Sequence, residues 1–116
     1  MSVTVRCKYL SASKPTPIDI TISQSMAIRD IIIELVRAYS MKPYDIDNGL
    51  CDYFASDLVA ALEAIGKVAD MDWTPDDDEL PGHMWVECED RFYDAETPMG
   101  VADWRELLIF KNSISR

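Results

Sequence analysis

The chain has 116 residues, 48% of them apolar, and a formal net charge of −10 at pH 7. This length and apolar content suffice for one hydrophobic core and predict a single domain. The acidic balance argues against direct binding to nucleic acid, which requires clustered Lys and Arg side chains. We expect a cytoplasmic protein without a membrane segment, because no apolar run approaches the roughly 20 residues of a membrane span and the N-terminus lacks the apolar stretch of a secretory signal.

The three cysteines, Cys7, Cys51 and Cys88, are odd in number and widely spaced. This pattern favours free thiols in a reducing compartment over a disulfide framework. Since the chain has one histidine and no Cys-x-x-Cys pair, we expect neither a metal centre nor a cofactor. Cys7 and Cys88 fall on strand-like patterns and are expected to be buried.

The first third of the chain predicts a hairpin followed by a helix. Apolar residues alternate over residues 2–9 and again over 18–23, which is typical of two strands. Over residues 28–39 they recur at helical spacing, predicting an amphipathic helix with Ser23 or Ser25 as its N-cap.

A second helix is predicted from Leu50 to Ile65, ending at Gly66. Asp47 or Asn48 is the expected N-cap, preceded by an irregular approach over residues 45–49.

The segment Asp70–Glu79 contains six carboxylates in ten residues. No glycine stands where a calcium loop of the EF-hand type requires a sharp turn, so we expect a solvated loop with Trp73 exposed. Because the segment lies just before His83, the alternative is that it attracts a basic substrate segment or flanks a cleft.

Residues 84–88 and 91–95 predict two further strands, joined by a turn at Glu89-Asp90. A short amphipathic helical turn is then expected over 101–107, followed by a last strand at 109–110.

The length of that turn decides which side chains share a face. A two-residue turn pairs Cys88 with Arg91, and His83, Trp85, Asp94 and Glu96 then lie on one face of the hairpin. His83 and Asp94 become diagonal neighbours roughly 7–8 Å apart at the backbone. A three-residue turn would place Asp94 on the opposite face.

Cys51 lies at the predicted start of the second helix. The positive end of the helix dipole and the unpaired backbone N–H groups stabilise a thiolate there, although the helical phase also fits a small core residue. As a nucleophile Cys51 would need a base, for which His83 oriented by Asp94 is the candidate. Asn48 is a candidate oxyanion donor beside the Cys51 amide, and Trp85 is expected in the core or in the wall of a cleft.

Three motifs carry a resemblance to a known family. They are Gly-x-Cys-x-x-Phe-Ala at 49–55, His-x-Trp-Val-Glu at 83–87 and Tyr-Asp-Ala-Glu-Thr-Pro at 93–98. In order and spacing they resemble the transglutaminase-like branch of the papain-fold cysteine enzymes. The resemblance implies a small α+β domain in which the helix carrying the cysteine packs on an antiparallel sheet carrying the histidine and aspartate. An N-terminal hairpin and helix over residues 1–40 would precede a transglutaminase-like core over 45–110.

The same resemblance implies Cys51 as nucleophile, His83 as base and Asp94 as orienting acid. The first functional hypothesis is therefore a cysteine-dependent amide hydrolase or acyltransferase, that is, a peptidase, a deamidase or a transglutaminase-like enzyme. Its substrate would be a peptide or protein, with basic ones suited to the acidic chain. The alternative is a non-catalytic acidic module that blocks a basic protein surface, such as that of a nucleic-acid-binding partner.

Overall fold

The computed structural model describes residues 2–6, 19–76 and 81–114. Within this part of the chain every helix is too short or too polar to cross a lipid bilayer. The elements in chain order are β1 (Ser2–Arg6), β2 (Asp19–Ser23), α1 (Ile28–Tyr39), α2 (Pro43–Asp47), α3 (Cys51–Ala64), β3 (Ala69–Thr74), β4 (His83–Cys88), β5 (Arg91–Tyr93), the 3-10 helix η1 (Trp104–Glu106) and α4 (Leu108–Ile114).

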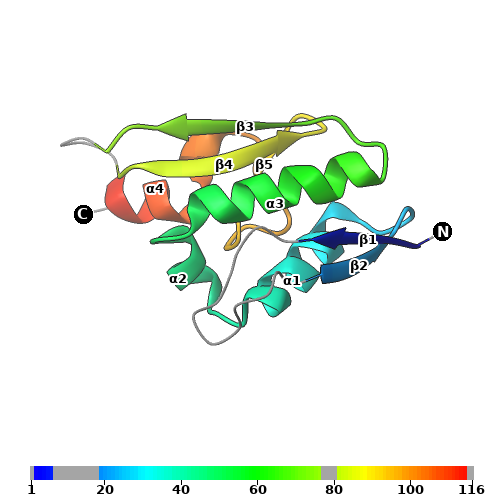
Figure 1. The fold of residues 1–116 in the computed structure, drawn as a ribbon. Helices are drawn as coiled ribbons and strands as arrows, with labels where there is room; N and C mark the ends of the chain where they lie inside the picture. Colours follow the sequence, from blue (N-terminus) through cyan, green and yellow to red (C-terminus); the bar gives the residue numbers. More distant parts are fainter. Residues whose placement is uncertain (1, 7–18, 77–80, 115–116) are drawn as a thin grey trace.

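The central element of this α+β fold is α3. On one side it packs against an antiparallel sheet of order β3-β4-β5, and on the other against α1 and the antiparallel pair β1-β2 (Figure 1). Helix α3, which begins with Cys51, therefore packs directly on the sheet that contains β4, and β4 begins with His83.

The main core fills the space around α3. The apolar stripe of α1 is buried there together with Ile20 and Ile22 of β2, the inner face of α3, and Val86 and Cys88 of β4. Each fully buried aliphatic side chain contributes about 1.5–3 kcal/mol relative to an exposed one. Because the N-terminal hairpin and α1 share this core with the sheet, the two expected parts of the chain are packed as one body.

A second, aromatic cluster covers the opposite face of the sheet. Side chains alternate along β4, so Trp85 points away from Val86 and packs with Leu107 and Phe110. The ring of Trp104 stacks on Trp85 with centroids 5.1 Å apart. This cluster attaches η1 and α4 to the sheet.

The β4–β5 hairpin has the predicted two-residue turn. Glu89 and Asp90 have φ values of 54° and 64°, as both central residues of a type I′ turn require. Cys88 accordingly pairs with Arg91, and Val86 with Tyr93. The β1–β2 pairing and the helix over 28–39 are also confirmed, while residues 7–18, including Cys7, lie outside the described part.

The expected helix caps are wrong. Ala27 and Leu50 are the N-cap residues of α1 and α3, and neither makes a side-chain capping bond. The hydroxyl groups of Ser23 and Ser25 instead lie 2.9 Å apart, bonded to each other.

Three segments adopt a different secondary structure from the one predicted. Residues 43–47 form α2 rather than an irregular approach, since Pro43 suits the first turn of a helix, where its missing N–H costs nothing. Residues 69–74 form the edge strand β3 rather than a loop. The loop prediction was wrong because the side chains of this strand are mostly charged or exposed. Residues 109–110 belong to α4 rather than to a strand, because Leu107 and Phe110 reach Trp85 at helical spacing.

Candidate active site

His83 and Asp94 are joined by a buried hydrogen bond. Nε2 of His83 lies 2.9 Å from Oδ2 of Asp94, and their side chains are 0% and 2% exposed. β5 ends at Tyr93, so Asp94 is not paired across the sheet as the extended register implied, yet its side chain still reaches the first residue of β4. A second hydrogen bond, from the Glu96 amide to Oδ1 at 3.0 Å, orients the carboxylate.

The imidazole is held from two further elements. Its ring packs edge-on against Phe110 of α4, with centroids 5.6 Å apart, and lies 6.3 Å from the Trp85 ring of β4. These apolar neighbours exclude water around His83 and strengthen its interaction with Asp94.

Cys51 is the first residue of α3 and is a partly buried free thiol. Its N-cap residue, Leu50, makes no side-chain capping bond, and the start of the helix presents the positive end of the dipole near the thiol. Nδ1 of His83 is buried and, among the described residues, has no partner at hydrogen-bonding geometry. The thiol lies close enough to the ring for each group to shift the pKa of the other.

The protonation of Cys51 and His83 reflects this proximity. Burial raises the pKa of the Cys51 thiol, but interactions with His83 and with the Met84 backbone outweigh it, and the pKa lies below its ordinary value. Burial likewise lowers the pKa of His83, but Asp94, Cys51 and Asp47 raise it further, to about 9. Both shifts act in the direction of a thiolate–imidazolium pair.

The pKa of Cys88 shifts in the opposite direction from that of Cys51. It is buried in the main core, and burial raises the pKa of its thiol, opposed only weakly by Lys67. The prediction that Cys88 is a buried strand residue is confirmed.

Asp47, which the sequence suggested only as a helix cap, is part of this cluster. It is 2% exposed and accepts hydrogen bonds from the amides of Ala95 and Glu96, both at 3.3 Å. Burial and the neighbouring Asp94 raise the pKa of Asp47 to about 9, while His83 opposes the shift. An acidic residue in a short helix gives no sequence signal for such a contact 48 residues along the chain.

Asp47, His83 and Asp94 each place one potential ligand atom within 4.8 Å of the others. The four carboxylate oxygens already accept hydrogen bonds from the Ala95 and Glu96 amides and from His83. These bonds hold the three side chains together as a hydrogen-bonded network.

A hollow of about 280 Å³ opens beside the thiol. Cys51, Asn48 and Gly49 line one side of it, and Asp76, Gly82 and other residues complete the wall. The Asn48 amide nitrogen donates to the Tyr44 carbonyl at 2.8 Å, which directs part of its donor capacity back into α2. Trp85 does not line this hollow: at 2% exposure it is a core residue behind His83.

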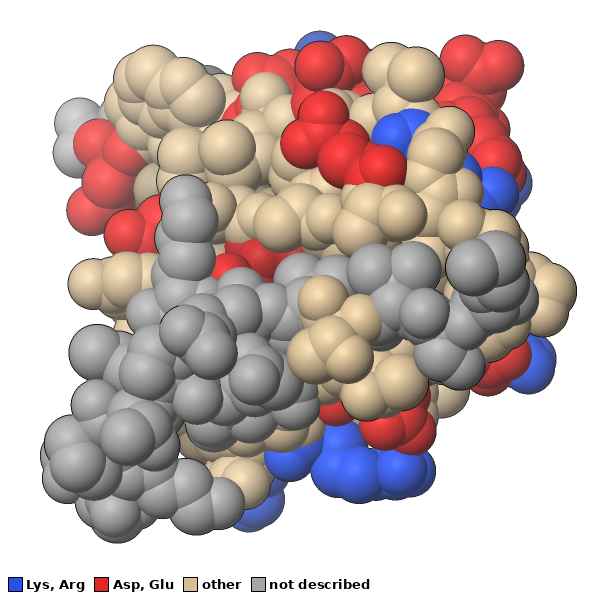
Figure 2. Space-filling view, turned by 45° about the vertical axis from the view of Figure 1, so that its right-hand side comes forward, with Lys and Arg blue, Asp and Glu red and all other residues tan. Residues whose placement is uncertain are grey.

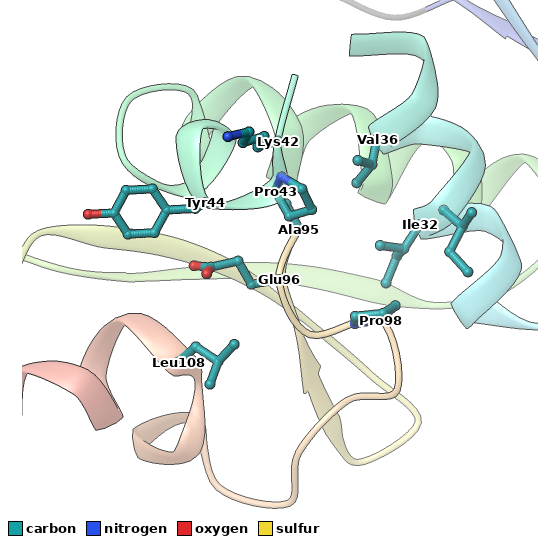
Figure 3. Close-up of a pocket in the computed structure, with 10 residues that line it drawn as sticks. Ile32, Val36, Lys42, Pro43, Tyr44, Ala95, Glu96, Pro98 and Leu108 are labelled. Atoms are coloured by element: carbon teal, nitrogen blue, oxygen red, sulfur yellow. The ribbon is translucent and has the colours of Figure 1, made fainter. Parts of the chain in front are cut away.

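A larger groove of about 570 Å³ lies on the other side of the carboxylate cluster. Its walls are mostly apolar side chains from α1, the start of α2 and α4, and Glu96 points toward it between Tyr44 and Leu108 (Figure 3). Since Ala95 and Glu96 both border this groove and bind Asp47, the segment after β5 separates the groove from the buried site.

Cys51, His83 and Asp94 therefore come together, Asn48 lies at the rim of the same hollow, and Trp85 supports the imidazole from the core. Comparison with known proteins adds no relative: no family model, curated protein or solved structure matches the chain significantly.

Proposed function

We propose that this protein is a cysteine-dependent amide hydrolase or acyltransferase of the transglutaminase-like, papain-fold type. The observation that carries the proposal is the buried His83–Asp94 hydrogen bond beside a helix-terminal thiol whose pKa is lowered. Burial instead raises the pKa of the core thiol of Cys88.

The proposed reaction uses the Cys51 thiolate as nucleophile and the His83 imidazolium as proton donor. The Cys51 thiolate attacks the carbonyl carbon of an amide, forming a C–S bond while the carbonyl oxygen becomes an oxyanion. The start of α3 supplies the backbone N–H of Cys51 as a donor for that oxyanion. His83 then donates its proton to the leaving nitrogen as the C–N bond breaks.

The thioester that remains is resolved in a second step. Water, or an amine in an acyl transfer, gives up a proton to His83 as it attacks the thioester carbon, and the C–S bond breaks to restore the thiolate. Asp94 keeps the imidazole oriented and stabilises its charged form in both steps.

Trapping of the acyl-enzyme tests the proposal. An activated ester such as p-nitrophenyl acetate should acylate Cys51 within a burst and transfer one acetyl group to the Cys51 peptide, as read by mass spectrometry. Cys51→Ala should abolish the burst and Cys88→Ala should retain it. Acetylation distributed over several cysteines, or a burst that survives Cys51→Ala, would refute the proposal.

The acidic surface supports a second candidate, the non-catalytic module that binds a basic protein surface. Its charge of −10 is suitable, but Figure 2 shows acidic side chains in several separate groups with basic ones among them, at least on the face in view. Binding of a basic protein that survives Cys51→Ala and weakens steeply with salt would favour this candidate.

A further inference from the structure

The feature with no role so far is Asp47, a buried carboxyl group facing a second buried carboxyl group. Asp47 and Asp94 are each 2% exposed, and both accept from the same Glu96 amide, at 3.3 and 3.0 Å. Two buried carboxylates this close cannot both ionise at low cost, so one of them holds a proton.

The contacts indicate which one. Asp94 faces the His83 ring at 2.9 Å, a partner that favours the carboxylate form. Among the described residues, Asp47 accepts from two backbone amides, both at 3.3 Å, and it interacts with the side chain of Glu96, another acid. Its raised pKa agrees with the neutral form.

We infer that Asp47 is a positioning residue for the His83–Asp94 pair: its neutral carboxyl group anchors the Ala95–Glu96 backbone and thereby fixes Asp94 against the imidazole. The inference rests on the proposed function, since it assigns Asp47 a part in the same site. Asp47 is the last residue of α2, and its hydrogen bonds connect the segment before Cys51 with the segment that follows β5.

The groups facing His83 come from every element packed around it. They are Asp94 after β5, Asp47 from α2, Cys51 from α3, and the uncharged rings of Phe110 from α4 and Trp85 from β4. Asp94 and Cys51 raise the pKa of His83, and Asp47 adds to this only in its charged form. Loss of the Asp47 anchor should therefore lower that pKa, by releasing Asp94.

The single histidine of the chain makes the test direct, because its imidazole resonances in an NMR titration need no assignment. Asp47→Asn carries no charge and keeps one of the two acceptor oxygens, so it should lower the His83 pKa by less than the loss of the whole side chain does. Asp47→Ala removes the anchor and should lower the pKa by about one unit or more. Should Asp47→Ala fail to fold, Asp47→Ser gives the same comparison with a hydroxyl too short to bridge both amides.

Two results would overturn the inference. An unchanged His83 pKa in the folded Ala or Ser variant would reduce Asp47 to a structural contact, and an Asn variant shifted as far as the Ala variant would show that a neutral side chain with one acceptor oxygen does not provide the anchor. The titration needs no substrate, and repeating it with Cys51→Ala removes the thiol. Failure of this inference and failure of the enzymatic proposal are therefore separate results.

Discussion

Nε2 of His83 and Oδ2 of Asp94 lie 2.9 Å apart, and both side chains are buried from solvent. The two residues are 11 positions apart, at the start of one strand and just beyond the end of the next. A type I′ turn at Glu89-Asp90 fixes the register that brings them together.

The first prediction concerns Asp94→Asn. Removal of the carboxylate charge should lower the His83 pKa from about 9 by about one unit or more. The Cys51 thiolate then loses its cationic partner, so alkylation of Cys51 at neutral pH should slow. NMR titration of His83 and timed alkylation measure the two effects. Asp90→Asn is the matched control, since Asp90 is an exposed turn residue with positive φ, which Asn tolerates; equal effects of the two changes would refute the assignment.

The second prediction is a bell-shaped pH dependence of amide turnover. The rate should rise through the lowered pKa of Cys51 and fall above about pH 9, where His83 loses the proton that the leaving nitrogen needs. Acylation by an activated ester should keep the rising limb and lose the falling one, because its leaving group needs no protonation. A falling limb of equal size for both substrates would contradict this role of His83.

Two parts of this site are predicted by the sequence: the hairpin register and the position of Cys51. Period-2 alternation in β4 and β5 and the two residues between them predict the hairpin register, and with it the meeting of His83 and Asp94. Cys51 at the start of α3 followed from the helical stripe and the glycine before it.

Asp47 could not be predicted, because its role depends on where α2 packs rather than on local pattern. β3 was missed for a different reason: as an edge strand it pairs by its backbone with β4 and exposes Asp70, Met71, Asp72 and Trp73, so its side chains lack the alternation of a half-buried strand. Trp73 is exposed as expected, at 60%.

The third prediction is the dependence of stability on pH. The folded-state pKa of His83, about 9, exceeds its ordinary value of about 6.5, so its stabilising contribution is complete below pH 6.5 and is lost as the pH rises through 9. The raised pKa of Asp47 acts in the same direction from about pH 4 to pH 9, because the folded state again binds more protons. Tm should therefore fall between about pH 6 and pH 9.

Thermal unfolding at constant ionic strength measures this change. Asp47→Asn should flatten it, and Cys51→Ala should steepen it, since the lowered pKa of Cys51 contributes with the opposite sign. A Tm that stays constant or rises across this interval would contradict the protonation states assigned to the site.

The fourth prediction concerns metals. Because hydrogen bonds to amides and to His83 hold Asp47 and Asp94 in place and the proposed chemistry uses no metal, treatment with EDTA should leave the alkylation rate of Cys51 and the Tm unchanged. If EDTA lowers the alkylation rate or the Tm and added Zn²⁺ restores it, the cluster is instead a metal centre.

The most direct test of the account is the pH dependence of Cys51 alkylation by iodoacetamide, followed by peptide mapping with Cys88 as the internal reference. The account predicts an apparent pKa for Cys51 below the free-thiol value of about 8.5 and one for Cys88 above it. His83→Gln, which keeps a donor for Asp94 but cannot become a cation, should raise the Cys51 value alone. A Cys51 pKa at or above about 8.5 that does not respond to His83→Gln would contradict the catalytic role of the pair.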